Sequence, residues 1–194
     1  MGKMKNSTIA WIIVGAVVLI LLLWFVGAYN NFVSLSQNVD SKWSQVENDY
    51  QVQADKIPNF ASTITSQVGV ETKFVKDVIA ARTAFKDAQG QAQIDAAGQQ
   101  MNNGITTLVN AVAENYPVLQ ASTGYTQLRD ELSASQNKIG NSRRLYIEAI
   151  QDYNTATKRF PSNIIAGIFG FSGKDYYKAA AGTNTPVLGN GTLP

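Results

Sequence analysis

Hydrophobic residues form one continuous run near the start of the chain and afterwards recur at helical spacing. The run begins at Ile9 and ends at Ala28, and no charged residue occurs between Lys5 and Asp40. Twenty helical residues rise about 30 Å, which is the thickness of the hydrocarbon core of a bilayer. The run therefore predicts a transmembrane helix over residues 9–28.

Aromatic residues stand near both ends of this run. Trp11 and Trp24 suit the headgroup level on the two sides of a bilayer. A buried core helix is a weaker interpretation, because so small a protein could not cover it. A cleaved signal peptide stays open as an alternative, with Val26-Gly27-Ala28 as its cleavage site, although the run exceeds the usual apolar length of about 7–15 residues.

The charges that flank the run predict its orientation. Lys3 and Lys5 precede it, whereas Lys42 is the first cation after it and stands among acidic residues. The positive-inside rule then places residues 1–8 in the cytoplasm as a short N-terminus and the rest of the chain outside the cytoplasm.

Beyond the run, apolar positions alternate at three and four residues, which is typical of amphipathic helices. The first of these helices continues straight from the membrane segment to about residue 56, where Pro58 is expected to break it. The other predicted helices cover residues 58–88, 91–115 and 123–160. The fold class is therefore all-α: an N-terminal transmembrane helix continuous with an antiparallel four-helix bundle over residues 29–178, followed by a disordered tail over residues 179–194.

The last predicted helix has the most regular pattern in the chain. Its apolar seam begins at Tyr125 and ends at Phe160, and it also contains small residues, namely Ser135, Ser142, Ala149 and Ala156. Small seam residues allow a close approach of helices within the bundle. They could equally mark a face that packs against another copy of the chain.

A short apolar segment follows Pro161 and is far too short to span a membrane. Its candidate membrane-interface residues are Ile164, Ile165, Ile168, Phe169 and Phe171. One interpretation places the segment at the bilayer surface or on the base of the first helix, with Lys158, Arg159, Lys174 and Lys178 near anionic headgroups. The other interpretation is a short helix that caps the bundle core.

Composition excludes several classes of function. The chain has no cysteine and no histidine, which excludes disulfides, thiol nucleophiles, Ser-His-Asp triads and Cys-based zinc sites. After Lys5 the chain carries 14 basic and 14 acidic residues, so nucleic acid is not expected as a partner. No phosphate-binding loop or catalytic motif occurs, and we expect no enzyme activity, no cofactor and no metal site.

Several short motifs resemble the LemA family. In chain order they are Tyr29-Asn30-x-Phe-Val, Trp43-Ser44-Gln45-Val46, Ile57-Pro58-Asn59, Ala80-Ala81-Arg82, Ala113-Glu114-Asn115-Tyr116-Pro117, Leu128-x-x-Glu131-Leu132, Asn137-Lys138-Ile139, Ser142-Arg143-x-x-Tyr146, Asp152-Tyr153-Asn154, Phe160-Pro161 and Gly170-Phe171. The resemblance implies an N-terminal membrane helix and an all-α bundle. Some members carry a His-Glu pair where this chain has Val70-Glu71, so no role can rest on that histidine.

Four charged residues lie within these motifs: Arg82, Glu114, Glu131 and Arg143. Ion pairs that fix the register of the helices are favoured over a ligand-binding network. A separate candidate is a partner-binding corner at the tip of the bundle, formed by Pro58, Asn59, Tyr116 and Pro117.

The sequence therefore predicts a non-enzymatic single-pass membrane protein. Its rigid bundle would act as a self-associating scaffold in membrane or envelope organisation, with the lipid bilayer and further copies of the chain as partners. The alternative is a sensor or adaptor that binds a ligand or a protein at the bundle tip. An enzyme that uses carboxylates and a divalent metal is a third and weaker hypothesis.

Overall fold

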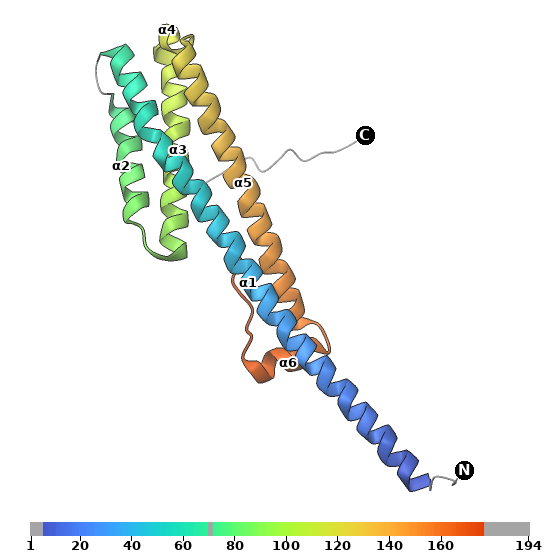
Figure 1. Cartoon of the computed structure of the whole chain (residues 1–194). Coiled ribbons are helices and arrows are strands. Elements are labelled where there is room, and N and C mark those ends of the chain that lie inside the picture. Colours follow the sequence, from blue (N-terminus) through green and yellow to red (C-terminus); the bar gives the residue numbers. More distant parts are fainter. Residues whose placement is uncertain (1–5, 70–71, 177–194) are drawn as a thin grey trace, which may run out of the picture. The chain divides into compact units, whose positions relative to one another are not determined.

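The computed structural model describes residues 6–69 and 72–176, and these residues form helices and no strand (Figure 1). The helices are α1 (Asn6–Val68), α2 (Lys73–Asp87), α3 (Gly90–Asn115), α4 (Pro117–Gln120), α5 (Thr123–Lys158) and α6 (Ser162–Phe169). The all-helical prediction and the long apolar N-terminal helix are thus confirmed. Lys178 and the predicted tail over residues 179–194 lie outside the described residues.

The chain divides into two compact units, and α1 and α5 each contribute to both. Among the described residues, the first unit comprises residues 6–44 and 143–176, and the second comprises residues 45–69 and 72–142. The first unit holds the apolar segment of α1 and all of α6, whereas the second holds α2, α3 and α4. Each unit is described separately below.

The predicted helix break at Pro58 is wrong, because α1 continues through this residue to Val68. Proline has no backbone N–H, so the carbonyl of Ala54, four residues earlier, loses its usual helical donor. The Nε–H of Arg82 on α2 donates to that carbonyl at 2.8 Å. A side chain from a neighbouring helix thus replaces the missing hydrogen bond, and the helix can accommodate the proline.

The real end of α1 is a glycine. Gly69 has a φ of +76°, and its N–H donates to the carbonyl of Thr65 at 2.9 Å. A left-handed glycine after the last turn is a common helix stop. Thr72 caps the next helix, α2, since its side chain accepts from the N–H of Val75. Residues 60–68, which were predicted to belong to the second helix, therefore complete the first.

In the second unit, α1 contacts α2, α3 and α5. The ring of Tyr50 on α1 packs against Phe85 on α2, and a side chain at Gly98 on α3 would collide with the same tyrosine ring. Phe60 on α1 stacks on Tyr125 at the start of α5, with ring centroids 5.6 Å apart. The core of this unit is therefore centred on one face of α1. The residues of this face are fully buried: 46, 50, 54, 57, 60 and 64.

The predicted seam of α5 faces the interior of the protein. Ser135, Ser142 and Ala149 are all buried, so these small residues serve packing within the chain rather than a face for a second copy. Phe160, the last predicted seam position, is 76% exposed because α5 ends at Lys158. A further short helix, α4, occupies the Tyr116–Ser122 connection and was not predicted.

Candidate membrane-contact site

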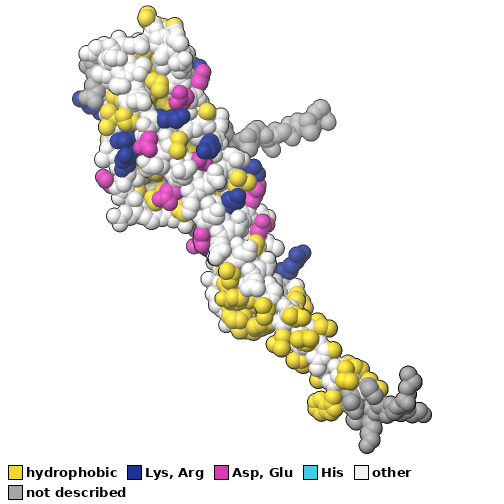
Figure 2. Space-filling view, in the orientation of Figure 1, with side chains coloured by type: hydrophobic (Ala, Val, Ile, Leu, Met, Phe, Trp, Pro, Cys, Tyr) yellow, Lys and Arg dark blue, Asp and Glu magenta, His cyan; other side chains and the backbone are white. Residues whose placement is uncertain are grey.

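The apolar segment of α1 has no cover from the rest of the protein. Helix α1 holds one segment that is long and apolar enough to cross a membrane, and 0% of that segment is buried. Its side chains, from Trp11 at 75% exposed to Leu23 at 66% exposed, form the hydrophobic stretch seen in Figure 2. Such a surface is unfavourable in water, and a bilayer would bury it.

Helix α6 packs against α1 just where this segment ends. Ile165 and Ala166 are buried against Phe32, and Phe25, Ala28 and Phe171 pack around them. The Phe171 ring stacks on the Phe32 ring with centroids 5.0 Å apart. Of the five predicted interface residues, Ile165 and Phe171 thus pack on the base of the helix that follows the apolar segment.

Two polar clamps hold α6 in this position. The hydroxyl of Ser162, the first residue of α6, lies 2.7 Å from the Ala156 carbonyl near the end of α5. On the other side of α6, the Asn154 amide donates to the Lys174 carbonyl at 2.8 Å and accepts from the Lys174 N–H at 2.8 Å. The connection after α6 is therefore tied back to α5, and both ends of the short helix are fixed.

The ammonium group of Lys174 is part of the same clamp. It lies 3.0 Å from a carboxylate oxygen of Asp40 on α1 and 5.6 Å from the centre of the Tyr153 ring. The predicted headgroup contact of Lys174 is therefore replaced by an ion pair within the protein. Lys158 and Arg159, at the end of α5, are exposed.

The remaining predicted interface residues are exposed to different degrees, and Phe169 also packs against α1. Ile164 is 51% exposed, Ile168 is 63% exposed and Phe169 is 44% exposed. Phe160 lies outside the predicted set but is exposed beside them in the sequence. We call Phe160, Ile164, Ile168 and Phe169 the α6 surface. Helix α6 is thus apolar on both sides: one side completes the core of the first unit, and the other presents exposed apolar groups.

Two of the four charged residues of the sequence motifs contact a neighbouring helix. Arg82 donates to the Ala54 carbonyl, and Glu131 lies 3.2 Å from the Lys56 ammonium group. Glu114 is exposed, and Arg143 belongs to the first unit. Contacts between helices, of the kind that fixes register, thus account for Arg82 and Glu131.

Other buried polar groups of the second unit are also structural. Asp49 on α1 is 1% exposed and pairs with the ammonium group of Lys138 on α5 at 2.9 Å. The Tyr125 hydroxyl donates to the Val109 carbonyl at 3.4 Å. Burial raises the pKa of Tyr125, and nearby Arg129 opposes the shift, so the hydroxyl keeps its proton and remains a donor at neutral pH.

The predicted partner residues all belong to the second unit. Pro58 and Asn59 are exposed on α1, ten and nine residues before its end at Val68. Tyr116 and Pro117 stand at the junction of α3 and α4, next to Val118, which is 86% exposed. A partner contact at these residues stays a prediction.

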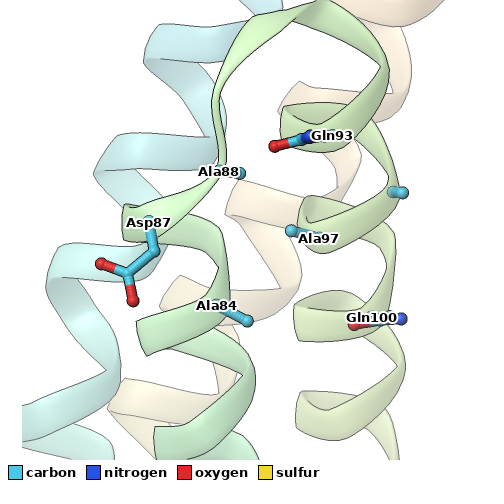
Figure 3. A pocket seen from close by; sticks show the side chains of 7 residues that line it. Ala84, Asp87, Ala88, Gln93, Ala97 and Gln100 are labelled. Carbon is cyan, nitrogen blue, oxygen red and sulfur yellow. The ribbon is translucent and has the colours of Figure 1, made fainter.

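A shallow pocket of about 310 Å³ lies between α2 and α3 near their connecting turn (Figure 3). Alanines form most of its wall, and Asp87 is the one charged residue among the side chains that line it. The pocket lies at the end of α2 where α3 begins, and α4 lies at the far end of α3 (Figure 1). It therefore gives no support to a ligand site at the predicted tip.

The described residues show no arrangement for metal chemistry. Within residues 6–69 and 72–176, no group of three or more Asp or Glu side chains could hold a metal ion. The expected lack of enzyme activity stays a prediction, since a structure of the chain alone does not test it.

Two structural features were missed by sequence reasoning. Asn154 was noted only as part of a family motif, and nothing in its own helix indicated that it would bond the backbone of Lys174, 20 residues later. Gly98 was passed over within α3, although an isolated glycine in a helical pattern often marks a close approach of another element. Its ideal Cβ position lies 2.6 Å from the Tyr50 ring.

Comparison with known proteins adds a family and three relatives. A family model described as LemA family matches residues 42–188. Magnetosome protein MamQ 2 and Magnetosome protein MamQ 1 of Paramagnetospirillum magneticum are each 23% identical to this chain over 185 residues, which cover 82% of this chain and 68% of each relative. Magnetosome protein MamQ of Magnetospirillum gryphiswaldense is 26% identical over 78 residues, 40% of this chain and 29% of the relative.

Proposed function

The chain belongs to the LemA family, and from this premise we propose that it is a non-enzymatic, single-pass membrane protein whose helical bundle acts as a self-associating scaffold in membrane or envelope organisation. The observation that carries the proposal is the continuity of α1 from its apolar segment into the second unit. This one helix of 63 residues contains an uncovered apolar segment and then supplies the buried face of the second unit. The protein is therefore membrane-associated and helical, and the scaffold role extends these properties.

Three further points support the proposal. The contacts among α1, α2, α3 and α5 fit an antiparallel four-helix bundle in the second unit. The names of the relatives refer to the magnetosome and to no reaction. A membrane also confines the copies of a protein to two dimensions, which raises their effective concentration, so weak lateral contacts are enough for assembly.

Self-association can be counted directly in membranes. We expect the full-length protein, labelled with one dye per chain and reconstituted in vesicles at high lipid dilution, to bleach in more than one step per particle. Single-molecule photobleaching gives the number of chains. A single bleaching step at every dilution would refute the scaffold proposal.

A variant with 20 leucines in place of residues 9–28 distinguishes the bundle from the transmembrane segment. This variant keeps an apolar length sufficient to span the bilayer but removes Gly15 and Ala16, the small residues of the segment. We expect it to assemble as the natural chain does, because the proposal assigns the contacts to the bundle. Loss of assembly in this variant would place the contacts in the transmembrane segment instead.

The proposed orientation has the N-terminus in the cytoplasm and the bundle outside it. The chain has no cysteine, so Ser41→Cys, an exposed position on α1 beyond the apolar segment, provides a unique label site. We expect a membrane-impermeant maleimide to label this variant in intact cells. Labelling that appears only after the membrane is permeabilised would reverse the orientation.

A further inference from the structure

We propose that the α6 surface lies in the boundary between lipid headgroups and acyl chains of the same bilayer that α1 crosses. The inference rests on the proposed transmembrane role of residues 9–28 and adds a second, shallow contact with lipid. It assigns a partner to an apolar face of α6 that stays between 44% and 76% exposed among the described residues.

The depth of α6 follows from its ring contacts with α1. The Phe169 ring lies 5.4 Å from the Phe25 ring and 4.7 Å from the Tyr29 ring. These two residues stand on either side of Ala28, the last residue of the apolar run, and are separated by about 6 Å along the helix. A side chain that touches both must lie at the edge of the hydrocarbon core, where interfacial helices are buried by about 5–10 Å.

The direction of the exposed side chains makes lipid the natural cover. Helix α6 directs Ile165 and Ala166 toward Phe32, and it leaves Ile164 and Ile168 exposed beside the end of the apolar run. The Asn154–Lys174 clamp holds the helix there, so it cannot fold these isoleucines into the core without breaking two hydrogen bonds. Exposure of these side chains to water is unfavourable, whereas their transfer to the bilayer boundary is favourable.

Charge and size also favour lipid over a second copy of the chain. No charged residue occurs between Arg159 and Lys174, while Lys158 and Arg159 are exposed at the edge of this uncharged stretch, where lipid phosphates would lie. Four side chains are too few for a specific protein interface, which buries about 800 Å² on each partner. A bilayer surface needs no such area, because it is continuous with the lipid around α1.

The proposal can be tested with single labels on the full-length protein. We would prepare Ile168→Cys in the α6 surface, Ile20→Cys within the apolar segment and Ser41→Cys on α1, about 18 Å beyond Tyr29 along the helix axis. All three positions are exposed, so an attached NBD dye should not disturb packing. Each variant is reconstituted in vesicles of phosphatidylethanolamine and phosphatidylglycerol that contain brominated lipids.

We expect the dye at residue 168 to show blue-shifted emission and to be quenched most by bromines near the headgroup end of the acyl chain. The dye at residue 20 should be quenched most by deep bromines, and the dye at residue 41 should be quenched several-fold less than either. If residue 20 is quenched but residue 168 behaves like residue 41, the α6 proposal is wrong and the transmembrane proposal stands. If residue 20 is not quenched, both are wrong.

One further outcome separates lipid from protein as the cover. Blue-shifted emission at residue 168 without quenching by any brominated lipid would mean that another protein surface, such as a second copy, covers α6. That result would overturn the lipid proposal, and contact with protein would then explain the exposed apolar side chains of α6.

Discussion

Replacement of Gly98 by alanine is expected to lower the stability of the second unit by about 1–2 kcal/mol, although alanine is the better helix former. An ideal Cβ at this position lies 2.6–2.7 Å from three carbon atoms of the Tyr50 ring. Tyr50 is fully buried and packs against Phe85, so its ring cannot move aside without disturbing α2 as well. The steric cost therefore exceeds the gain in helix propensity of about 1 kcal/mol.

Gly140→Ala is the matched control for this prediction. Gly140 lies within α5, and nothing stands within 4 Å of an added Cβ. The same substitution should therefore stabilise the protein there, by up to about 1 kcal/mol. Thermal unfolding of both full-length variants in one detergent, followed by circular dichroism, should shift Tm in opposite directions, by about 2–4 °C per kcal/mol. Two upward shifts would show that α1 and α3 do not approach closely at Gly98.

The pattern of apolar residues predicted the helices well where one side of the helix is buried. The predicted α5 seam is right from Tyr125 to Tyr153, because a regular spacing of three and four residues places the apolar side chains on one face of a helix. It fails at Phe160, since periodicity alone does not show where a helix stops. At the other end of α5, the N–H of Tyr125 donates to the Ser122 hydroxyl at 3.4 Å, so a serine directly before the helix caps its first turn.

The misplaced helix boundary has a non-local cause. Pro58 is a sound local signal for a break, and the residues that decide otherwise are distant in the sequence. The donor to the Ala54 carbonyl belongs to Arg82, 28 residues further on. Meanwhile Gly69, the actual helix stop, gave no periodic signal of its own. Local rules cannot anticipate a hydrogen bond supplied by another helix.

The sequence predicted which residues form the candidate site, but it did not predict which of them are buried and which are exposed. The apolar segment after Pro161 left two interpretations open, a bilayer contact and a packed helix. The structure divides the segment between two faces, since Ile165 is buried while Ile168 is exposed. An eight-residue helix has too few turns for its pattern to show which face meets the core. The packing partner, Phe32, lies more than 130 residues earlier in the chain.

Removal of the Arg82 side chain should show how much its hydrogen bond to the Ala54 carbonyl stabilises α1 around Pro58. Arg82→Ala leaves the Ala54 carbonyl without a donor at the position where Pro58 has no N–H. A hydrogen bond from a charged group contributes about 1.5–3 kcal/mol, so we expect a loss of stability of that size. Lys86→Ala, one turn further along α2, is the matched control. It removes only an exposed ion pair with Asp55 at 3.8 Å and should cost no more than about 0.5 kcal/mol.

The cause of that loss can be isolated by a double-mutant cycle with Pro58→Ala. Alanine at position 58 supplies a backbone N–H that can donate to the Ala54 carbonyl, as in any regular helix. Arg82→Ala should then cost at least about 1 kcal/mol less in the Pro58→Ala background than in the natural chain, a coupling typical of groups that share a partner. Tm values of the four proteins in one detergent give this coupling. Equal costs in both backgrounds would mean that Arg82 stabilises the protein by some other contact, and that α1 tolerates its proline without help from α2.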